Sequence, residues 1–256
     1  MTPTTLILRT AGTNCDRELA YAFELAGAKA ETLHLHKLID DPARIEAFDL
    51  IGIPGGFSYG DDIAAGRIFA NRLRHRLYEP LLAAIDRGTP IIGICNGFQV
   101  LVKLGLLPDP HAGRQLATLA DNRGGRFLDR WSPLVVDAGS RCIWTKGLKA
   151  FDLPIAHAEG RFVPADEQVL TAMRDQGQVA LRYAPEQNPN GSVDDIAGIC
   201  DPTGLVLGLM PHPERYVTAS HHPQWTRQSA PGEPAGLAFF RNAVEHVRSR
   251  SAAPAG

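Results

Sequence analysis

The run from Pro90 to Gln99 constrains the fold most, because a short apolar segment turns there into a helical one. Residues 91–94 are apolar and rich in β-branched side chains, which is typical of a buried strand, and residues 100–104 continue at helical length. Cys95 lies at the junction with a glycine two residues before and two after it, the pattern of a nucleophile elbow. We therefore expect Cys95 to be exposed at a helix N-terminus, which favours the thiolate. The alternative is an inert core cysteine.

Length and composition favour one globular domain over residues 1–256, ending in a flexible tail at about 249–256. The four cysteines are scattered without CxxC spacing, so neither a zinc ribbon nor a disulfide framework is expected. The first residues carry no basic leader, and no apolar run has membrane-spanning length. A formal net charge of -2 offers no basic surface for nucleic acid. These features predict a cytoplasmic protein that binds neither membrane nor nucleic acid.

Two patterns divide the chain. In the first part, predicted strands alternate with helical segments, which favours an α/β fold with a parallel or mixed sheet flanked by helices. These strands are residues 6–9, 30–35, 49–53 and 91–94. From about residue 116 onward, short apolar stretches predict additional, mostly antiparallel strands. They are residues 134–136, 142–144, 155–157, 179–183, 196–200 and 206–210. A surface loop at 223–234 and a closing helix at 236–247 complete the prediction.

His212 and Glu214 lie in the segment Pro211-His212-Pro213-Glu214, directly after a predicted strand. Two prolines favour an extended backbone, in which residues two apart project to the same side. Glu214 could then orient the imidazole of His212 and leave its other nitrogen for Cys95. The alternative is a rigid surface turn with an exposed histidine and glutamate.

A glycine-rich turn, Pro54 to Asp61, follows the third predicted strand. Acyl transfer needs backbone N–H donors where the oxyanion forms, and glycine allows a close approach. The N–H groups of Gly56 and Asn96 are the expected pair. A tight connection or a phosphate cradle are the alternatives, although no Gly-Lys-Ser/Thr follows to make a P-loop.

Together, Gly93 to Gln99, Pro54 to Gly56 and His212 to Glu214 resemble the triad-type, class I glutamine amidotransferases, whose architecture is flavodoxin-like. The similarity is closest to the glutaminase subunit of phosphoribosylformylglycinamidine synthase, the stand-alone PurQ type, and covers nearly the whole chain. Further matching runs are Gly12 to Asp16, Phe57 to Asp61, Asn188 to Ser192 and Gly208 to Arg215.

The resemblance implies that Cys95, His212 and Glu214 form a catalytic triad that hydrolyses L-glutamine through a thioester. Gly55, Gly56, Asn96 and Gln99 would form the oxyanion hole and the glutamine site; an ordinary polar helix residue is the alternative for Gln99. The ammonia would pass to a large synthetase subunit that converts formylglycinamide ribonucleotide to the amidine, in de novo purine biosynthesis. A small bridging subunit is also expected. The chain has no Walker motif, so ATP and Mg are expected on the synthetase and no cofactor here.

Several residues compete with this assignment. His157 and Glu159 form a rival pair, also two apart on a predicted strand, and Ala158 stands where the family has glycine, which predicts strain if φ is positive there. Cys15 begins a predicted helix, which favours a low pKa, but we expect a structural or interface role. We expect no metal, because the spacing of the histidines matches no zinc pattern. Another cysteine hydrolase, such as a peptidase, and a noncatalytic assembly subunit are the alternative functions.

Overall fold

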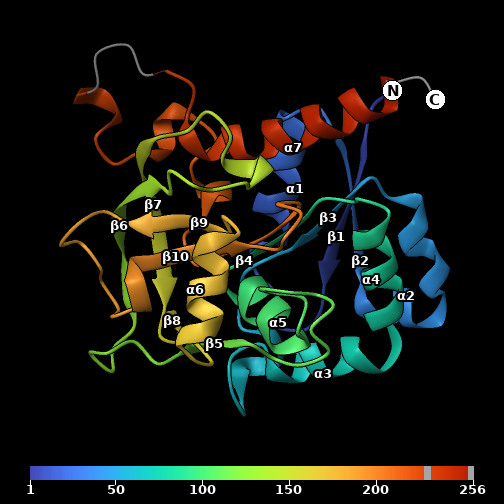
Figure 1. Cartoon of the computed structure of the whole chain (residues 1–256). Coiled ribbons are helices and arrows are strands. Elements are labelled where there is room, and N and C mark those ends of the chain that lie inside the picture. The colour runs from blue at the N-terminus through green and yellow to red at the C-terminus, as the bar shows by residue number, and fades with distance from the viewer. Residues whose placement is uncertain (228–231, 253–256) are drawn as a thin grey trace.

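The computed structural model describes residues 1–227 and 232–252, built around a mixed nine-stranded sheet (Figure 1). The strand order is β2-β1-β3-β4-β11-β10-β9-β6-β7, and the five strands from β2 to β11 are parallel. The parallel strands are β2 (Lys29–His34), β1 (Thr4–Arg9), β3 (Leu50–Ile53), β4 (Ile91–Ile94) and β11 (Val206–Leu209). The antiparallel extension is β10 (Ile196–Cys200), β9 (Val179–Tyr183), β6 (Leu128–Val136) and β7 (Ala150–His157). The expected α/β class with added antiparallel strands is confirmed.

Seven α-helices lie within the described residues. They are α1 (Asp16–Leu25), α2 (Leu35–Asp40), α3 (Arg67–Arg76), α4 (Tyr78–Asp86), α5 (Asn96–Leu104), α6 (Glu167–Asp175) and α7 (Ala235–Ala252). A separate two-stranded sheet pairs β5 (Ala117–Ala120) with β8 (Arg161–Pro164). None of the described helices is both long and apolar enough to cross a membrane.

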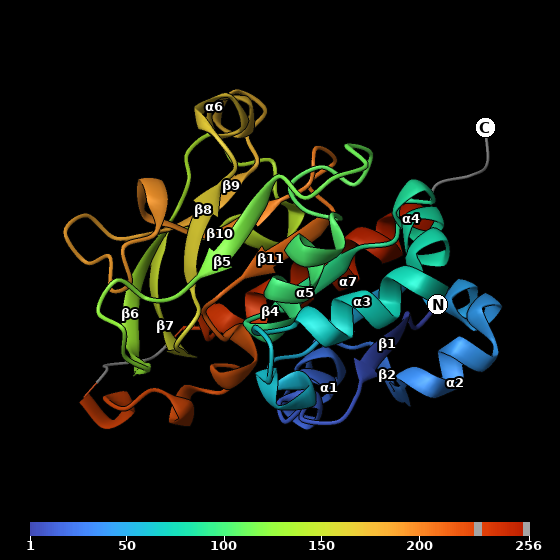
Figure 2. The same ribbon diagram turned by 90° about the horizontal axis from the view of Figure 1, so that it is seen from below.

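Helices α1 and α5 cover opposite faces of the parallel sheet. Leu19 of α1 lies over Gly52 of β3, whereas Gly97 of α5 lies against its neighbour Ile53. Successive residues of a strand face opposite ways, so the two helices are separated by the sheet. Helix α7 packs beside α1 (Figure 1), and α3 packs beside α5 (Figure 2). These two layers bury the strands and leave the carboxyl ends of β3, β4 and β11 at one edge.

An edge-to-face aromatic contact fastens α7 to α1. The ring of Phe240 in α7 lies 5.0 Å from that of Phe23 in α1, at 72°. Both side chains are fully buried, and burying a phenylalanine stabilises a fold by about 1.5–3 kcal/mol. The chain's last described helix therefore closes the core against its first.

The sequence-based prediction differs from the structure at several places, and strands β5 and β8 were not predicted. The strand expected at 142–144 is wrong, because Ile143–Thr145 forms a 3-10 turn that buries Trp144 and lets its indole donate to Leu205 O at 2.8 Å. Helix α6 was not predicted; Asp166 caps it by accepting from Val169 N–H. The tail expected from 249 is helical through Ala252, where Ser251 Oγ donates to Val247 O. Residues 228–231 of the predicted loop and 253–256 of the predicted tail lie outside the described residues.

Candidate active site

Cys95 forms the elbow between β4 and α5. Its φ of 52° and ψ of −106° lie in a region that non-glycine residues rarely adopt. Such backbone strain costs on the order of 1–3 kcal/mol and persists where surrounding contacts enforce it, often at active sites. Here the Cys95 N–H donates to Leu209 O of β11 at 2.8 Å. The elbow predicted from the flanking glycines is therefore present in the structure.

The expected exposure of Cys95 is wrong. The residue is 6% exposed, and its Sγ lies 3.6 Å from Ala156 O of β7. An elbow fixes the direction of the side chain, but the antiparallel extension supplies a strand that covers it.

His212 and Glu214 form a buried ion pair at the end of β11. The distance from His212 Nδ1 to Glu214 Oε1 is 2.6 Å, and the two residues are 1% and 2% exposed. The segment is not extended as expected, because Pro213–Arg215 is a 3-10 turn that starts at His212. The turn brings the carboxylate back to the ring, so the predicted pairing is present with a different backbone. His212 Nε2 has no hydrogen-bond partner among the described residues.

The charges around His212 favour its protonated form. Burial by itself lowers the pKa of His212, but the carboxylate of Glu214 and the neighbouring Cys95 outweigh burial and raise the pKa well above its ordinary value. The carboxylate of Glu214 and the neighbouring Cys95 thus favour the protonated imidazolium form of His212.

Glu214→Gln tests this electrostatic arrangement. A neutral amide no longer stabilises the imidazolium, so the pKa of His212 falls and the protonated ring is lost at a lower pH. We expect kcat/KM for glutamine hydrolysis to fall about 10²-fold, as for loss of general acid–base assistance. The alkaline limb of the pH profile should move to lower pH.

Glu18→Gln is the matched control for that variant. Glu18 is a partly exposed carboxylate whose Oε1 lies 3.4 Å from Arg215 Nε, one residue beyond Glu214. Its pH profile should match that of the unmodified protein. An alkaline limb that does not move in Glu214→Gln would contradict the proposed role of Glu214.

The turn after β3 brings Gly55 and Gly56 to the elbow. A Cβ placed on Gly55 would lie 3.0 Å from His212 Cε1 and 3.5 Å from Cys95 Cβ, so the turn lies close to both side chains. Gly56 has a φ of 141°, which favours glycine, and its N–H makes no hydrogen bond within the described residues. The N–H of Asn96, at the first position of α5, lacks an intrahelical partner. Both predicted oxyanion donors are therefore near Cys95, and their role stays a prediction.

In this structure, both polar ends of the Gln99 side chain are hydrogen-bonded to other residues of the protein. Its Oε1 accepts from Asn96 Nδ2 at 3.0 Å, and its Nε2 donates to Glu159 O at 2.5 Å. At 3% exposure it is a buried residue of α5. The predicted contact of Gln99 with glutamine stays a prediction.

The rival residues His157 and Glu159 do not pair with each other in the described chain. His157 Nδ1 lies 3.0 Å from Asn122 Oδ1, whereas the Glu159 carboxylate accepts from Ala65 N–H. Burial, with the positive charge of His212, lowers the pKa of His157 to about 4, so its ring is neutral at neutral pH. Ala158 does not have a positive φ, so the condition under which strain was expected there is not met.

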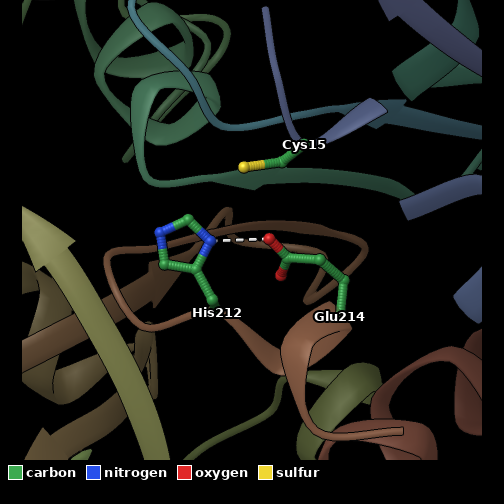
Figure 3. A group of neighbouring side chains, drawn as sticks. All are labelled: Cys15, His212 and Glu214. Atoms are coloured by element: carbon green, nitrogen blue, oxygen red, sulfur yellow. Dashed lines mark hydrogen bonds and ion pairs between the residues drawn. The ribbon is translucent and has the colours of Figure 1, made fainter. Parts of the chain in front are cut away.

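Cys15 points toward the ring of His212, as Figure 3 shows. Sequence reasoning missed this proximity, although the loop that contains Cys15 follows β1 and parallel strands end at the same edge of a sheet. Burial is the main cause that raises the pKa of Cys15, which is opposite to the expected low value. Arg215 Nη2 donates to its Sγ at 3.0 Å.

A metal-type grouping also appears at this point. Ligand atoms of Cys15, His212 and Glu214 lie within 4.8 Å of one another. The His212–Glu214 ion pair and the Arg215 guanidinium already engage this group, and a cation beside it opposes metal binding. The absence of a resident metal stays a prediction.

Comparison with known proteins decides the family. A protein-family model described as "CobB/CobQ-like glutamine amidotransferase domain" matches residues 2–247 of this chain. A phosphoribosylformylglycinamidine synthase subunit PurQ from Dehalococcoides mccartyi is 45% identical over 248 residues, which covers 95% of this chain and 97% of that protein. The chain belongs to the PurQ family of glutamine amidotransferases. It is therefore an enzyme of the glutamine amidotransferase class, as the motifs predicted.

Solved structures agree with this membership. A chain in the structure of PurLQS from Thermotoga maritima superimposes with a TM-score of 0.75 at 31% identity, covering 96% of this chain and all of that one. A glutamine amidotransferase from the same organism has a TM-score of 0.58 at 14% identity, with coverage of 96% and 98%. The second likeness concerns the fold alone.

Proposed function

We propose that the chain is the glutaminase component of a phosphoribosylformylglycinamidine synthase. The observation that carries the proposal is the strained Cys95 elbow beside the buried His212–Glu214 ion pair. A thiolate, an imidazolium and a carboxylate in this order support acyl transfer from an amide.

In the first half of the reaction, Cys95 Sγ attacks the side-chain amide carbon of L-glutamine. The N–H groups of Gly56 and Asn96 stabilise the oxyanion that forms on the former carbonyl oxygen. His212 Nε2 donates its proton to the departing nitrogen, the C–N bond breaks and ammonia leaves. A γ-glutamyl thioester remains on Cys95.

In the second half, His212 takes a proton from water, and the resulting hydroxide attacks the thioester carbon. The C–S bond breaks, glutamate leaves and the Cys95 thiolate faces an imidazolium again. The sum is glutamine and water giving glutamate and ammonia, so no cofactor is required on this chain.

We further propose that the ammonia passes to a large synthetase subunit, which carries ATP and Mg, with a small bridging subunit in the same complex. The Thermotoga maritima relative is a chain of PurLQS, which supports a partner of this kind. The burial of Cys95 and His212 also supports it, because a closed site that opens on docking would release ammonia only when an acceptor is present.

Ammonia release with and without the cognate synthetase subunit tests this function. The burial of Cys95 predicts weak hydrolysis by the chain alone, rising at least about tenfold when synthetase, ATP, Mg and formylglycinamide ribonucleotide are added. Direct detection of glutamate measures hydrolysis in both conditions, because the synthetase consumes the ammonia in the second one. Equal, high activity in both conditions would contradict partner control, and no activity in either would contradict the function itself.

A further inference from the structure

Both polar atoms of the Asn96 side chain, Oδ1 and Nδ2, form hydrogen bonds within the protein. Its Oδ1 accepts from Ser58 N–H at 3.3 Å, and its Nδ2 donates to Asp61 Oδ1 at 3.2 Å and to Gln99 Oε1 at 3.0 Å. Asn96 is 3% exposed, so these contacts replace water. A buried amide held at both ends leaves its own backbone little freedom to rotate.

Two of these contacts come from the loop that follows Gly56. Ser58 and Asp61 belong to this loop. Their bonds to Asn96 therefore connect the loop of Gly56, one predicted oxyanion donor, to the start of α5, where Asn96 supplies the other. The two N–H groups must stay at a fixed separation to hold one oxygen atom. The Asp61 contact is therefore a crosslink between the halves of the oxyanion hole.

Asp61 is itself held in a strained conformation. Its φ is 52°, following Tyr59 at 56°, and its Oδ1 also accepts from Gly66 N–H at 3.1 Å. The Tyr59 hydroxyl is fixed by Thr10 Oγ1 at 2.6 Å and by Arg72 Nη1 at 3.0 Å. Two non-glycine residues with positive φ, separated only by Gly60, persist only where the surroundings enforce them.

We propose that Asp61 is a positioning residue for amide hydrolysis: its carboxylate oxygen holds Asn96, and through Asn96 the oxyanion donor that follows Cys95. This inference rests on the proposed function of Cys95. Asp61 touches neither the nucleophile nor the base, so its effect is confined to the steps that form an oxyanion.

Three variants separate positioning from folding. Asp61→Ala removes the acceptor, and we expect kcat to fall about 10-fold to 100-fold with KM little changed, because the lost interaction acts in the transition state. Asp61→Asn keeps an acceptor oxygen and should restore kcat to within about threefold of the unmodified protein. Asp62→Ala, at the exposed neighbouring residue, should have no effect.

Alkylation of Cys95 by iodoacetamide measures the reactivity of the thiol in a reaction that forms no oxyanion. Because substitution at a saturated carbon forms no oxyanion, the alkylation rate in Asp61→Ala should equal that of the unmodified protein while glutamine hydrolysis falls. A parallel loss of both rates would overturn the proposal, since it would indicate collapse of the whole site.

A reciprocal exchange keeps the test valid if Asp61→Ala does not fold. Asn96→Asp places a carboxylate opposite Asp61 and should lower kcat. Adding Asp61→Asn lets the new amide donate to the new carboxylate but loses the bond from Gly66 N–H, so kcat should recover in part. Recovery of kcat in the double variant supports the crosslink, and no recovery contradicts it. All assays include the synthetase: an inactive unmodified protein would refute the proposed function, whereas equal activity in Asp61→Ala would refute only this inference.

Discussion

We expect Cys95→Ser to lower the kcat of glutamine hydrolysis by about 10⁴-fold or more, in the presence of the synthetase. The hydroxyl of serine is far less acidic than a thiol, so the charges that favour a thiolate beside His212 do not produce an alkoxide. The strained elbow holds serine in the same place, so the loss reports chemistry rather than position. Steady-state ammonia release measures the change.

Covalent labelling identifies the nucleophile directly. A glutamine-analogue chloroketone should modify Cys95 in the unmodified protein and leave Cys95→Ser unlabelled, as mass spectrometry of the intact chain would show. Cys15→Ser is the matched control, because Cys15 is also buried beside His212. We expect it to keep labelling at Cys95 and to lose only about fivefold in rate, the equivalent of one weak hydrogen bond of about 1 kcal/mol. Labelling at Cys15 would overturn the assignment.

The second large effect is expected for His212→Ala, at about 10³-fold in kcat. The variant removes the imidazolium that stabilises the thiolate, the acid that protonates ammonia and the base that activates water. Loss of one group thus affects both halves of the reaction. Single-turnover measurements should show slow formation of the thioester as well as slow hydrolysis.

His157→Ala is the comparison that decides between the two histidines. His157 is equally buried, but it is neutral, and its ring is bonded to Asn122 instead of a carboxylate. We expect a loss of less than about tenfold, together with a lower melting temperature from the cavity. Abolished turnover in His157→Ala with normal turnover in His212→Ala would reverse the assignment.

Local patterns in the chain were sufficient to predict the elbow and four of the five parallel strands; the fifth, β11, was expected among the mostly antiparallel strands but pairs parallel to β4. Apolar runs of four to six residues with β-branched side chains, followed by helical segments, specify a buried parallel sheet because each run must be covered on both faces. The glycines around Cys95 predicted the sharp turn of its backbone, because the conformation of a turn depends mainly on the residues nearest to it. For the same reason, the error at 142–144 arose where an apolar triplet is too short for periodicity to separate a strand from a buried turn.

Long-range contacts could not be predicted in the same way. The Asp61–Asn96 bond joins residues 35 apart, and Cys15 meets an arginine 200 residues away. Nothing in either local segment specifies which distant loop lies against it. The covering of Cys95 by β7 has the same origin, because the sequence indicated that antiparallel strands exist but not where they dock.

The sequence by itself determined which groups gather at one edge of the sheet: Cys95, the Gly55–Gly56 turn and His212 each follow a strand that ends there. Only the tertiary structure decided how these groups are enclosed and charged. It buries Cys95, sets the His212–Glu214 distance through a 3-10 turn and clamps Asn96 from a separate loop. The physical reason is that turn chemistry and periodicity act over a few residues, whereas burial and electrostatics depend on every segment that packs against the site.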